Sequence, residues 1–322
     1  MANKLFVAPA PHVHGPETTQ KIMRDVIIAL CPALVVSAWV FGWDVLRVTA
    51  IAIASCVLVE WLIQKFLIKG ECTVGNLSAV LTGLLLSFNL PSSIPWWIIV
   101  IGSVVAIGIA KMSFGGLGKN PFNPALVGRV FLLIAYPVQM TTFPAPNAVA
   151  LDGFSGATPL AALKANPGML DLDPSLFVES ELLGSLGEVA ALPLLLGFAY
   201  MLYRKVITWH IPVAVLGSMF IFAWVVALFG GASAAVMFEL PLFHILAGGA
   251  ILGAVYMATD YATSPMTPKG MLIYGVGIGV ITMCIRLWGA YPEGMSFAIL
   301  IMNAVTPLLN KYVKPKRFGL KK

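Results

Sequence analysis

Charged residues are scarce in this sequence. Asp, Glu, Lys and Arg make up 11% of its 322 residues, while hydrophobic residues make up 59% and the mean hydropathy is +0.91. A soluble globular domain carries roughly 25% charged residues, so an ordinary soluble protein is excluded and lipid is indicated as the main solvent. A hydrocarbon core about 30 Å thick takes roughly 20 apolar residues per helix, so this length allows about ten crossings.

Cysteine is sparse as well, and its spacing is uninformative for metals. The four cysteines, Cys31, Cys56, Cys72 and Cys284, are scattered and include no C-x-x-C pair. This excludes a metal or iron–sulfur site and a disulfide framework within the chain. The net charge of +6 comes from basic residues at the ends of apolar runs and in the tail, where juxtamembrane anchoring explains it, so no nucleic-acid partner is expected.

Apolar runs between charged residues and Pro or Gly breaks predict the membrane spans. The third run ends at Asn89-Leu90-Pro91, and the eighth is followed by Asp260 and Pro265, so both are short and broken. The ten expected spans cover residues 26–42, 46–67, 76–90, 95–112, 122–139, 187–203, 206–229, 240–258, 270–288 and 295–312.

The placement of Lys and Arg predicts the orientation. The loop 140–186 contains five acidic residues against Lys164 alone, which fits the outer side of the membrane. Arg286 is the exception, because it falls near the outer surface. With ten crossings and cytoplasmic termini, the tail and these basic residues share the cytoplasmic side: Lys21, Arg24, Lys65, Lys69, Lys111, Lys119, Arg204, Lys205 and Lys269.

The expected fold is an all-α polytopic membrane protein of about ten transmembrane helices in two inverted five-helix repeats with broken helices. The segments from Val80 and from Ile251 show weak mutual similarity, and five spans in each half make the repeats inverted. The expected divisions are a polar N-terminal surface segment (1–25), a first repeat (26–139), an external loop (140–186), a second repeat (187–313) and a basic cytoplasmic tail (314–322).

The external loop contains a threonine among small residues, in the segment DGFSGATPL at 152–160. Small neighbours are expected to leave the Thr158 hydroxyl accessible, and Pro159 fixes the backbone that follows it. S-G-A-T by itself is also typical of an ordinary loop, so the wider sequence has to decide between the two interpretations.

Along nearly its whole length, the chain resembles the RnfD/NqrB family, with the family's motifs in the same order. DGFSGATPL is similar to the flavin-attachment site of that family, and the length is closer to the RnfD branch than to NqrB. The other similar segments are PHVHGPETTQKIM near the start, GKNPFNPALVGRVFLLIAYP at 118–137, YMATDYATSPMT at 256–267 and AYPEGMSFAILIMNAVTPLL at 290–309.

The resemblance implies that Thr158 bears covalent FMN, attached through a phosphoester by a flavin transferase that uses FAD. Ser155, Gly156 and Ala157 are then the recognition context. A tether of this kind keeps a redox carrier at a fixed distance from its partners, while the cofactor does the chemistry. The resemblance also implies a bacterial inner membrane location and partner subunits of an Rnf complex, including the flavoprotein G subunit. The steps that use NAD, ferredoxin and iron–sulfur clusters belong to those partners.

A second constellation opens the fifth expected span. Asn120 and Asn123 lie three residues apart, each followed by proline, so they are expected either to cap the helix or to face a ligand. NqrB-like subunits also hold a non-covalent riboflavin, and the resemblance places this region near a flavin. Arg129 within the span requires an acceptor, either a flavin phosphate or ring carbonyl or a neighbouring carboxylate.

Acidic residues near hydrocarbon are candidates for an ion path. Asp260 is expected to line such a path or to cap the helix that begins near Pro268, and Glu60 is a similar, weaker candidate, as is Glu293. Sodium and proton paths both use sparse polar groups of this kind, so the sequence leaves the ion open.

Two functions compete at this point. The first is an electron-transferring, ion-translocating subunit of a ferredoxin:NAD oxidoreductase that is not catalytic alone and contains no metal ligand. The second is a solute channel or secondary transporter, which inverted repeats and broken helices also favour. A transporter has no use for DGFSGATPL, so a covalent flavin would decide for the first.

Overall fold

The described part of the protein is almost entirely helical. The computed structural model describes residues 18–69, 72–144, 155–156, 158–165, 184–188, 190–230 and 236–314. The strands β1 (Phe143–Pro144) and β2 (Ser155–Gly156) pair antiparallel over two residues each. The N-terminal segment, Ala157, most of the external loop and the end of the tail lie outside the described residues.

Helices occupy all five expected spans of the first half. Two of them begin at side-chain caps: Thr18 accepts from the backbone N–H of Lys21, and Asn123 accepts from Ala125 and Leu126 ahead of the fifth span. The elements are α1 (Thr19–Phe41), α2 (Trp43–Leu62), η1 (Ile63–Ile68), η2 (Val74–Asn76), α3 (Ser78–Phe88), α4 (Trp96–Ser103), η3 (Val104–Ile109), η4 (Met112–Phe114), α5 (Pro124–Ala135) and α6 (Pro137–Thr141).

The second half follows the expected spans equally closely. A short helix in the loop precedes it, and Thr267 caps the fourth span by accepting from Gly270 N. The elements are α7 (Pro159–Ala165), α8 (Ala191–Tyr203), α9 (His210–Phe229), α10 (Val236–Leu246), α11 (Ala250–Leu252), η6 (Gly253–Met257), α12 (Pro268–Trp288) and α13 (Met295–Tyr312).

The structure confirms a multi-pass helical membrane protein. By length and composition, five helices of the described chain can each cross a membrane, and the broken pair α10 with α11–η6, bent by 63°, makes up to six. The apolar helices α3, α5 and α8 are shorter, with 11, 12 and 13 residues. The larger expected count of about ten crossings stays a prediction.

Helices α1 and α8 pack against each other in opposite directions. Near the start of α1, Asp25 accepts from the guanidinium of Arg204, which follows α8, at 3.0 and 3.2 Å. Near the end of α1, the Ser37 hydroxyl donates to the carbonyl of Leu186, just before α8, at 2.6 Å. The first helices of the two halves are therefore antiparallel.

Two helix breaks position the segments around the loop. The free carbonyl of Phe88 at the end of α3 accepts from Gly187 N at 2.9 Å, and the carbonyl of Leu90 accepts from Leu186 N at 3.3 Å. Carbonyls at a helix end lack partners within the helix, so they hold this segment in place. The segment 184–188 is thereby fixed against the break of the first half.

The second helix break, where α10 ends, provides the hydrogen-bond acceptors of Arg286, a residue expected near the outer surface of the membrane. Arg286 is only 3% exposed and donates to the carbonyls of His244, Ala247 and Gly248 where α10 ends. Gly248 has φ +68°, and a Cβ there would lie 2.7 Å from Nη2 of Arg286, so the turn needs glycine. Helix-end carbonyls bind this cation inside the protein, and its expected position near the outer side of the membrane stays a prediction.

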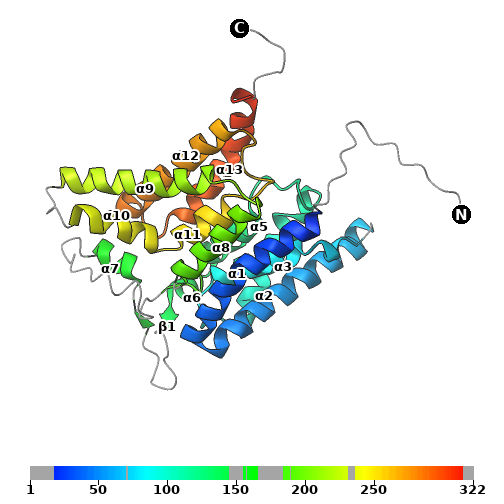
Figure 1. Ribbon diagram of the computed structural model, residues 1–322. Helices are drawn as coiled ribbons and strands as arrows, with labels where there is room; N and C mark the ends of the chain where they lie inside the picture. Colours follow the sequence, from blue (N-terminus) through cyan, green and yellow to red (C-terminus); the bar gives the residue numbers. More distant parts are fainter. Residues whose placement is uncertain are drawn as a thin grey trace, which may run out of the picture.

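The first and last helix ends of the chain lie at one end of the helical bundle, and the external loop region lies at the other. Figure 1 shows the start of α1 and the end of α13 toward one end, and β1 and α7 at the opposite end. The loop with Thr158 therefore lies across the bundle from both terminal helix ends.

Candidate functional site

Thr158 lies directly before α7, at the end of the bundle marked by β1. Its hydroxyl oxygen accepts a hydrogen bond from Ala161 N at 3.2 Å, which is the geometry of an N-cap. The residue is 5% exposed. The expectation of an openly accessible threonine was wrong, because the residue is buried in the folded chain.

Thr158 instead lines a cavity of about 180 Å³, here named the Thr158 cavity. This is smaller than the roughly 300 Å³ at which small-molecule pockets usually begin, so it could take part of a cofactor but not enclose one. Its lining combines an amide, an ion pair, an aromatic ring and apolar groups, from Asn89, Arg129, Leu133, Met140, Thr141, Phe143, Thr158, Ala161, Tyr291, Pro292 and Glu293.

Arg129 and Glu293 form an ion pair in the wall of this cavity. The Arg129 guanidinium donates to the Glu293 carboxylate and to the Ser296 hydroxyl. Of the two acceptors expected for Arg129, the structure thus shows the neighbouring carboxylate. Its Nε is buried and has no hydrogen-bond partner among the described residues, which leaves one donor unused.

A second carboxyl group lies behind this ion pair, on a residue that the sequence analysis missed. Glu188 is 8% exposed, hydrogen-bonds to Glu293 and accepts from the Ser185 hydroxyl at 2.7 Å. Burial, followed by the charge of Glu293, raises the pKa of Glu188 to about 8. In the sequence Glu188 begins an apolar run, so no local signal sets it apart from a helix-end charge.

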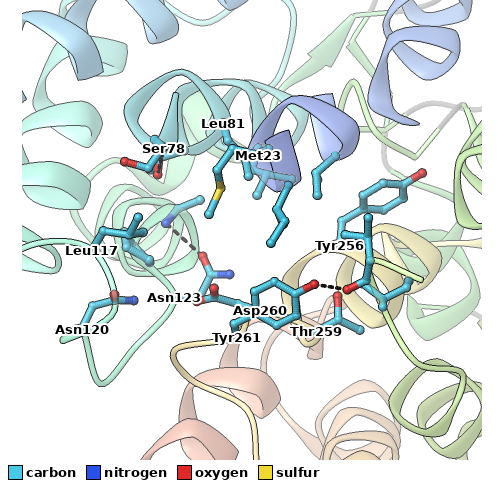
Figure 2. Close-up of a pocket in the computed structure, with 18 of the residues that line it drawn as sticks. Met23, Ser78, Leu81, Leu117, Asn120, Asn123, Tyr256, Thr259, Asp260 and Tyr261 are labelled. Carbon is cyan, nitrogen blue, oxygen red and sulfur yellow. Dashed lines mark hydrogen bonds between the residues drawn. The ribbon is translucent and has the colours of Figure 1, made fainter. Parts of the chain in front are cut away.

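A second cavity lies near the start of α1 and is here named the Asp260 cavity. Its volume is about 90 Å³. Figure 2 shows Met23 and Leu81 on one side of it, facing Asn123, Asp260 and Tyr261 on the other. The sequence-predicted residues Asn120, Asn123 and Asp260 therefore share one cavity, although they come from two distant segments.

Asn123 is the expected helix cap, and its contact with a ligand stays a prediction. Its Oδ1 caps α5, and its Nδ2 donates across the halves to the Met257 carbonyl at 3.1 Å. Met257 Sδ in turn lies 3.7 Å from Nδ2 of Asn89, which lines the Thr158 cavity. The end of η6 thus separates the two cavities and is contacted by an amide from each.

Asp260 forms a small hydrogen-bonded turn and does not cap α12. Its carboxylate accepts from the Thr263 hydroxyl at 3.3 Å and from Asn120, while Thr267 is the cap of α12. Desolvation raises the pKa of Asp260 above its ordinary value, and these hydrogen bonds only partly offset that shift. The helix-cap alternative was therefore wrong.

Glu60 is not a free carboxylate. Lys111 Nζ donates to Glu60 at 2.5 Å and to the Ser78 hydroxyl at 2.6 Å, and both charged side chains are at most 2% exposed. Lys111 does not anchor the chain at a membrane surface, because a lysine buried this deeply needs an anionic partner; its expected cytoplasmic side stays a prediction. Lys111 and Ser78 also line the Asp260 cavity.

Within the described residues, no group of three or more His, Cys, Asp or Glu side chains could hold a metal ion. Ser155 and Gly156 lie in β2, and Ala157 lies outside the described residues.

Comparison with known proteins gives a consistent result. The sequence model of the NQR2, RnfD, RnfE family matches residues 6–319. The chain is 46% identical over 323 residues to the D subunit of the Na⁺-translocating ferredoxin:NAD⁺ oxidoreductase complex of Acetobacterium woodii, covering 99% of this chain and 96% of that protein. It is 42% identical over 329 residues to the D subunit of the proton-translocating complex of Clostridium ljungdahlii, covering 99% and 98%. The D subunit of the ion-translocating oxidoreductase complex of Escherichia coli is 34% identical over 351 residues, covering 98% and 99%.

Proposed function

The chain belongs to the NQR2, RnfD, RnfE family, and we propose that it transfers electrons as the D subunit of an ion-translocating ferredoxin:NAD⁺ oxidoreductase complex, through FMN covalently bound to Thr158. The observation that carries this proposal is the place of Thr158, whose side chain lines a cavity beside the partly buried cation Arg129. FMN supplies one- or two-electron transfer when bound.

The residues of the Thr158 cavity fit such a cofactor. The unused Nε of Arg129 suits a phosphate or ring carbonyl oxygen, which is a strong acceptor for a guanidinium. Tyr291, stacked on Phe297 with ring centroids 5.2 Å apart, offers an aromatic wall. The cavity is too small to hold a flavin by itself, so a covalent link suits it better than free binding.

The transporter alternative is less well supported, since the relatives are named as subunits of redox complexes. Fluorescence in a denaturing gel tests the choice directly. Protein coexpressed with the flavin transferase should show a fluorescent band at its own mass, because a covalent flavin survives denaturation. A dark band at full expression of both proteins would favour the transporter.

Two inverted five-helix repeats are part of the proposal. The antiparallel pair α1 and α8 joins the first helices of the halves, and α5 and α13 bring the last ones into contact. Terminal helix ends at one end of the bundle fit an even number of crossings (Figure 1). The short helices α3, α5 and α8 would complete ten crossings, with both termini in the cytoplasm of a bacterial inner membrane.

This topology predicts opposite accessibility for two exposed positions. Thr142 beside β1 and Lys119 before α5 are both exposed. In a background without the native cysteines, Thr142→Cys should react with a membrane-impermeant maleimide on intact cells, whereas Lys119→Cys should react only after the cells are opened. The reverse pattern would overturn the orientation.

We place the next steps of electron transfer and ion translocation at the Asp260 cavity, on the proposed cytoplasmic side. Asn120 and Asn123 are candidates to contact a second, non-covalent riboflavin there, and Asp260 and Glu60 are candidates for the ion path, with Lys111 as the counter-charge of Glu60. Relatives named as sodium- and proton-translocating have similar identities to this chain, so overall similarity does not select the ion.

Asp260→Asn tests the ion-path assignment. We expect ion-coupled turnover of the complex to fall severalfold, because a neutral amide cannot take up a proton and lacks the negative charge that attracts a cation, while the covalent flavin on Thr158 is unchanged. Turnover with ion uptake into vesicles and in-gel fluorescence measure the two effects. Thr259→Ala, which lines the same cavity, is the control. Coupled transport at the wild-type rate in Asp260→Asn would remove Asp260 from the path.

A further inference from the structure

The contact between Glu188 and Glu293 has a consequence for protons. Two carboxylates in contact repel each other, and a hydrogen bond between two carboxyl groups requires a proton on one of them. The structure places the two groups in such a hydrogen bond, with Ser185 fixing Glu188 from the other side at 2.7 Å. The pair therefore needs one proton to keep its geometry.

The charged groups around the pair are balanced without that proton. Arg129 donates to Glu293, and the charge of Arg286 acts on both carboxyl groups from the second helix break. Lys164 is outside this cluster and is not a lining residue of the cavity; its Nζ donates to the carbonyls of Gly289 and Tyr291. The two arginines and two carboxylates sum to zero, so one shared proton gives this cluster a charge of +1.

We propose that Glu188 and Glu293 share one proton, and that the pair exchanges it with external water as the negative charge in the Thr158 cavity changes. This deepens the proposed function, on which its second half rests. A cluster charge of +1 complements a single phosphodiester anion on Thr158. Glu293 lines the cavity and Glu188 lies behind it, so the proton enters and leaves through Glu293. No electron passes through the carboxyl groups; partner redox subunits supply and remove electrons.

Electrostatics determines when the pair takes up its proton and when it releases it. Desolvation raises the pKa of Glu188 to about 8, so at lower pH the proton is held. Glu293 has its pKa lowered: burial acts to raise it, but the Arg129 charge and the hydrogen bond with Glu188 outweigh burial. A further negative charge in the cavity raises the pKa of the pair, and its removal lowers it.

The first test needs no cofactor. Infrared titration of the full chain with Thr158→Ala, which lacks the attachment oxygen, should show a protonated-carboxyl band that disappears at alkaline pH with a midpoint near 8. The band should be missing when Glu188→Gln is added to Thr158→Ala. It should remain when Asp44→Asn is added instead, because the Asp44 side chain is 56% exposed and lies outside the pair. A band unaffected by Glu188→Gln would overturn the shared proton, whatever the outcome for FMN.

The second test uses the covalent flavin and its reduction potential. Glutamine is neutral at every pH, so the potentials of wild type and Glu188→Gln should run together below the pKa of the pair, which the phosphodiester anion on Thr158 raises above its value in Thr158→Ala. Above it the wild-type potential should fall below that of the variant, by up to about 59 mV for each tenfold change in proton concentration if one proton accompanies one electron. The difference between the two proteins removes the pH dependence that the flavin has by itself.

If the potentials of wild type and Glu188→Gln ran parallel at all pH values while the infrared band was present, the proton would not be linked to charge in the cavity. That result would overturn the proposed proton exchange. Should Glu188→Gln fail to fold, Ser185→Ala replaces it. The Ser185 hydrogen bond lowers the pKa of Glu188, so its removal should shift the infrared midpoint to higher pH. An unchanged midpoint in Ser185→Ala would contradict the assignment of the band to Glu188.

Discussion

Thr158→Ala should abolish covalent flavin completely, because the hydroxyl oxygen of Thr158 is the only atom proposed to join protein and FMN. Mass spectrometry of the peptide that contains Phe154 to Leu160 should show the mass of FMN less one water in wild type and no addition in the variant. Coexpression with the flavin transferase is required, since the reaction needs that enzyme and FAD.

The structure changes the expected stability of this variant. An exposed loop threonine could be replaced at little cost, but Thr158 accepts from Ala161 N in the manner of an N-cap, so its loss should cost about 0.5–2 kcal/mol. Thr158→Ser keeps the oxygen and should keep both the cap and some flavin. Thr141→Ala lines the same cavity and should retain full flavin. FMN mass on another residue in Thr158→Ala would refute the site.

Breaking the buried pair of Glu60 and Lys111 should destabilise the protein by about 3–5 kcal/mol in either single variant, Glu60→Gln or Lys111→Met. Each change leaves the other charge without its partner at a site that is at most 2% exposed. Denaturant unfolding of the purified protein in detergent measures the loss. The exposed pair Asp44 and Arg47 is the control, and Asp44→Asn should cost less than about 1 kcal/mol.

The double variant separates pairing from packing. With both charges removed, the cost should be clearly smaller than the sum of the single costs, with a coupling of about 0.5–3 kcal/mol. Additive losses would show that the two residues act independently. Loss of ion transport in Lys111→Met at normal stability would instead give Lys111, which lines the Asp260 cavity, a direct part in the path.

Much of the fold was predictable from local sequence. All ten apolar runs are helical, with ends within several residues of those expected, because hydropathy and helix caps are properties of neighbouring residues. The Asn123 cap ahead of Pro124 and the break near Asn89 follow from the same local rules, whereas the break at Gly248 lies inside the run 240–258 and was not predicted. The family, too, was evident from motifs in order, and the comparison confirmed it.

The partners of the charged side chains could not be predicted in this way. Counting charges assigned Lys111 and Arg286 only a side of the membrane, and it could not show that the first is paired with Glu60 and the second with carbonyls at a helix break. Their acceptors lie 51 and 39 residues away in the chain, so no local pattern specifies them.

The sequence by itself thus determined the membrane setting, the helices, the family and the candidate Thr158. Tertiary structure alone decided that Thr158 is buried beside Arg129 and Glu293, that Glu188 lies behind them, and that Met257 separates two cavities. The physical reason is that hydropathy and capping are local free energies, whereas a buried charge or a cavity exists only where segments distant in the chain meet.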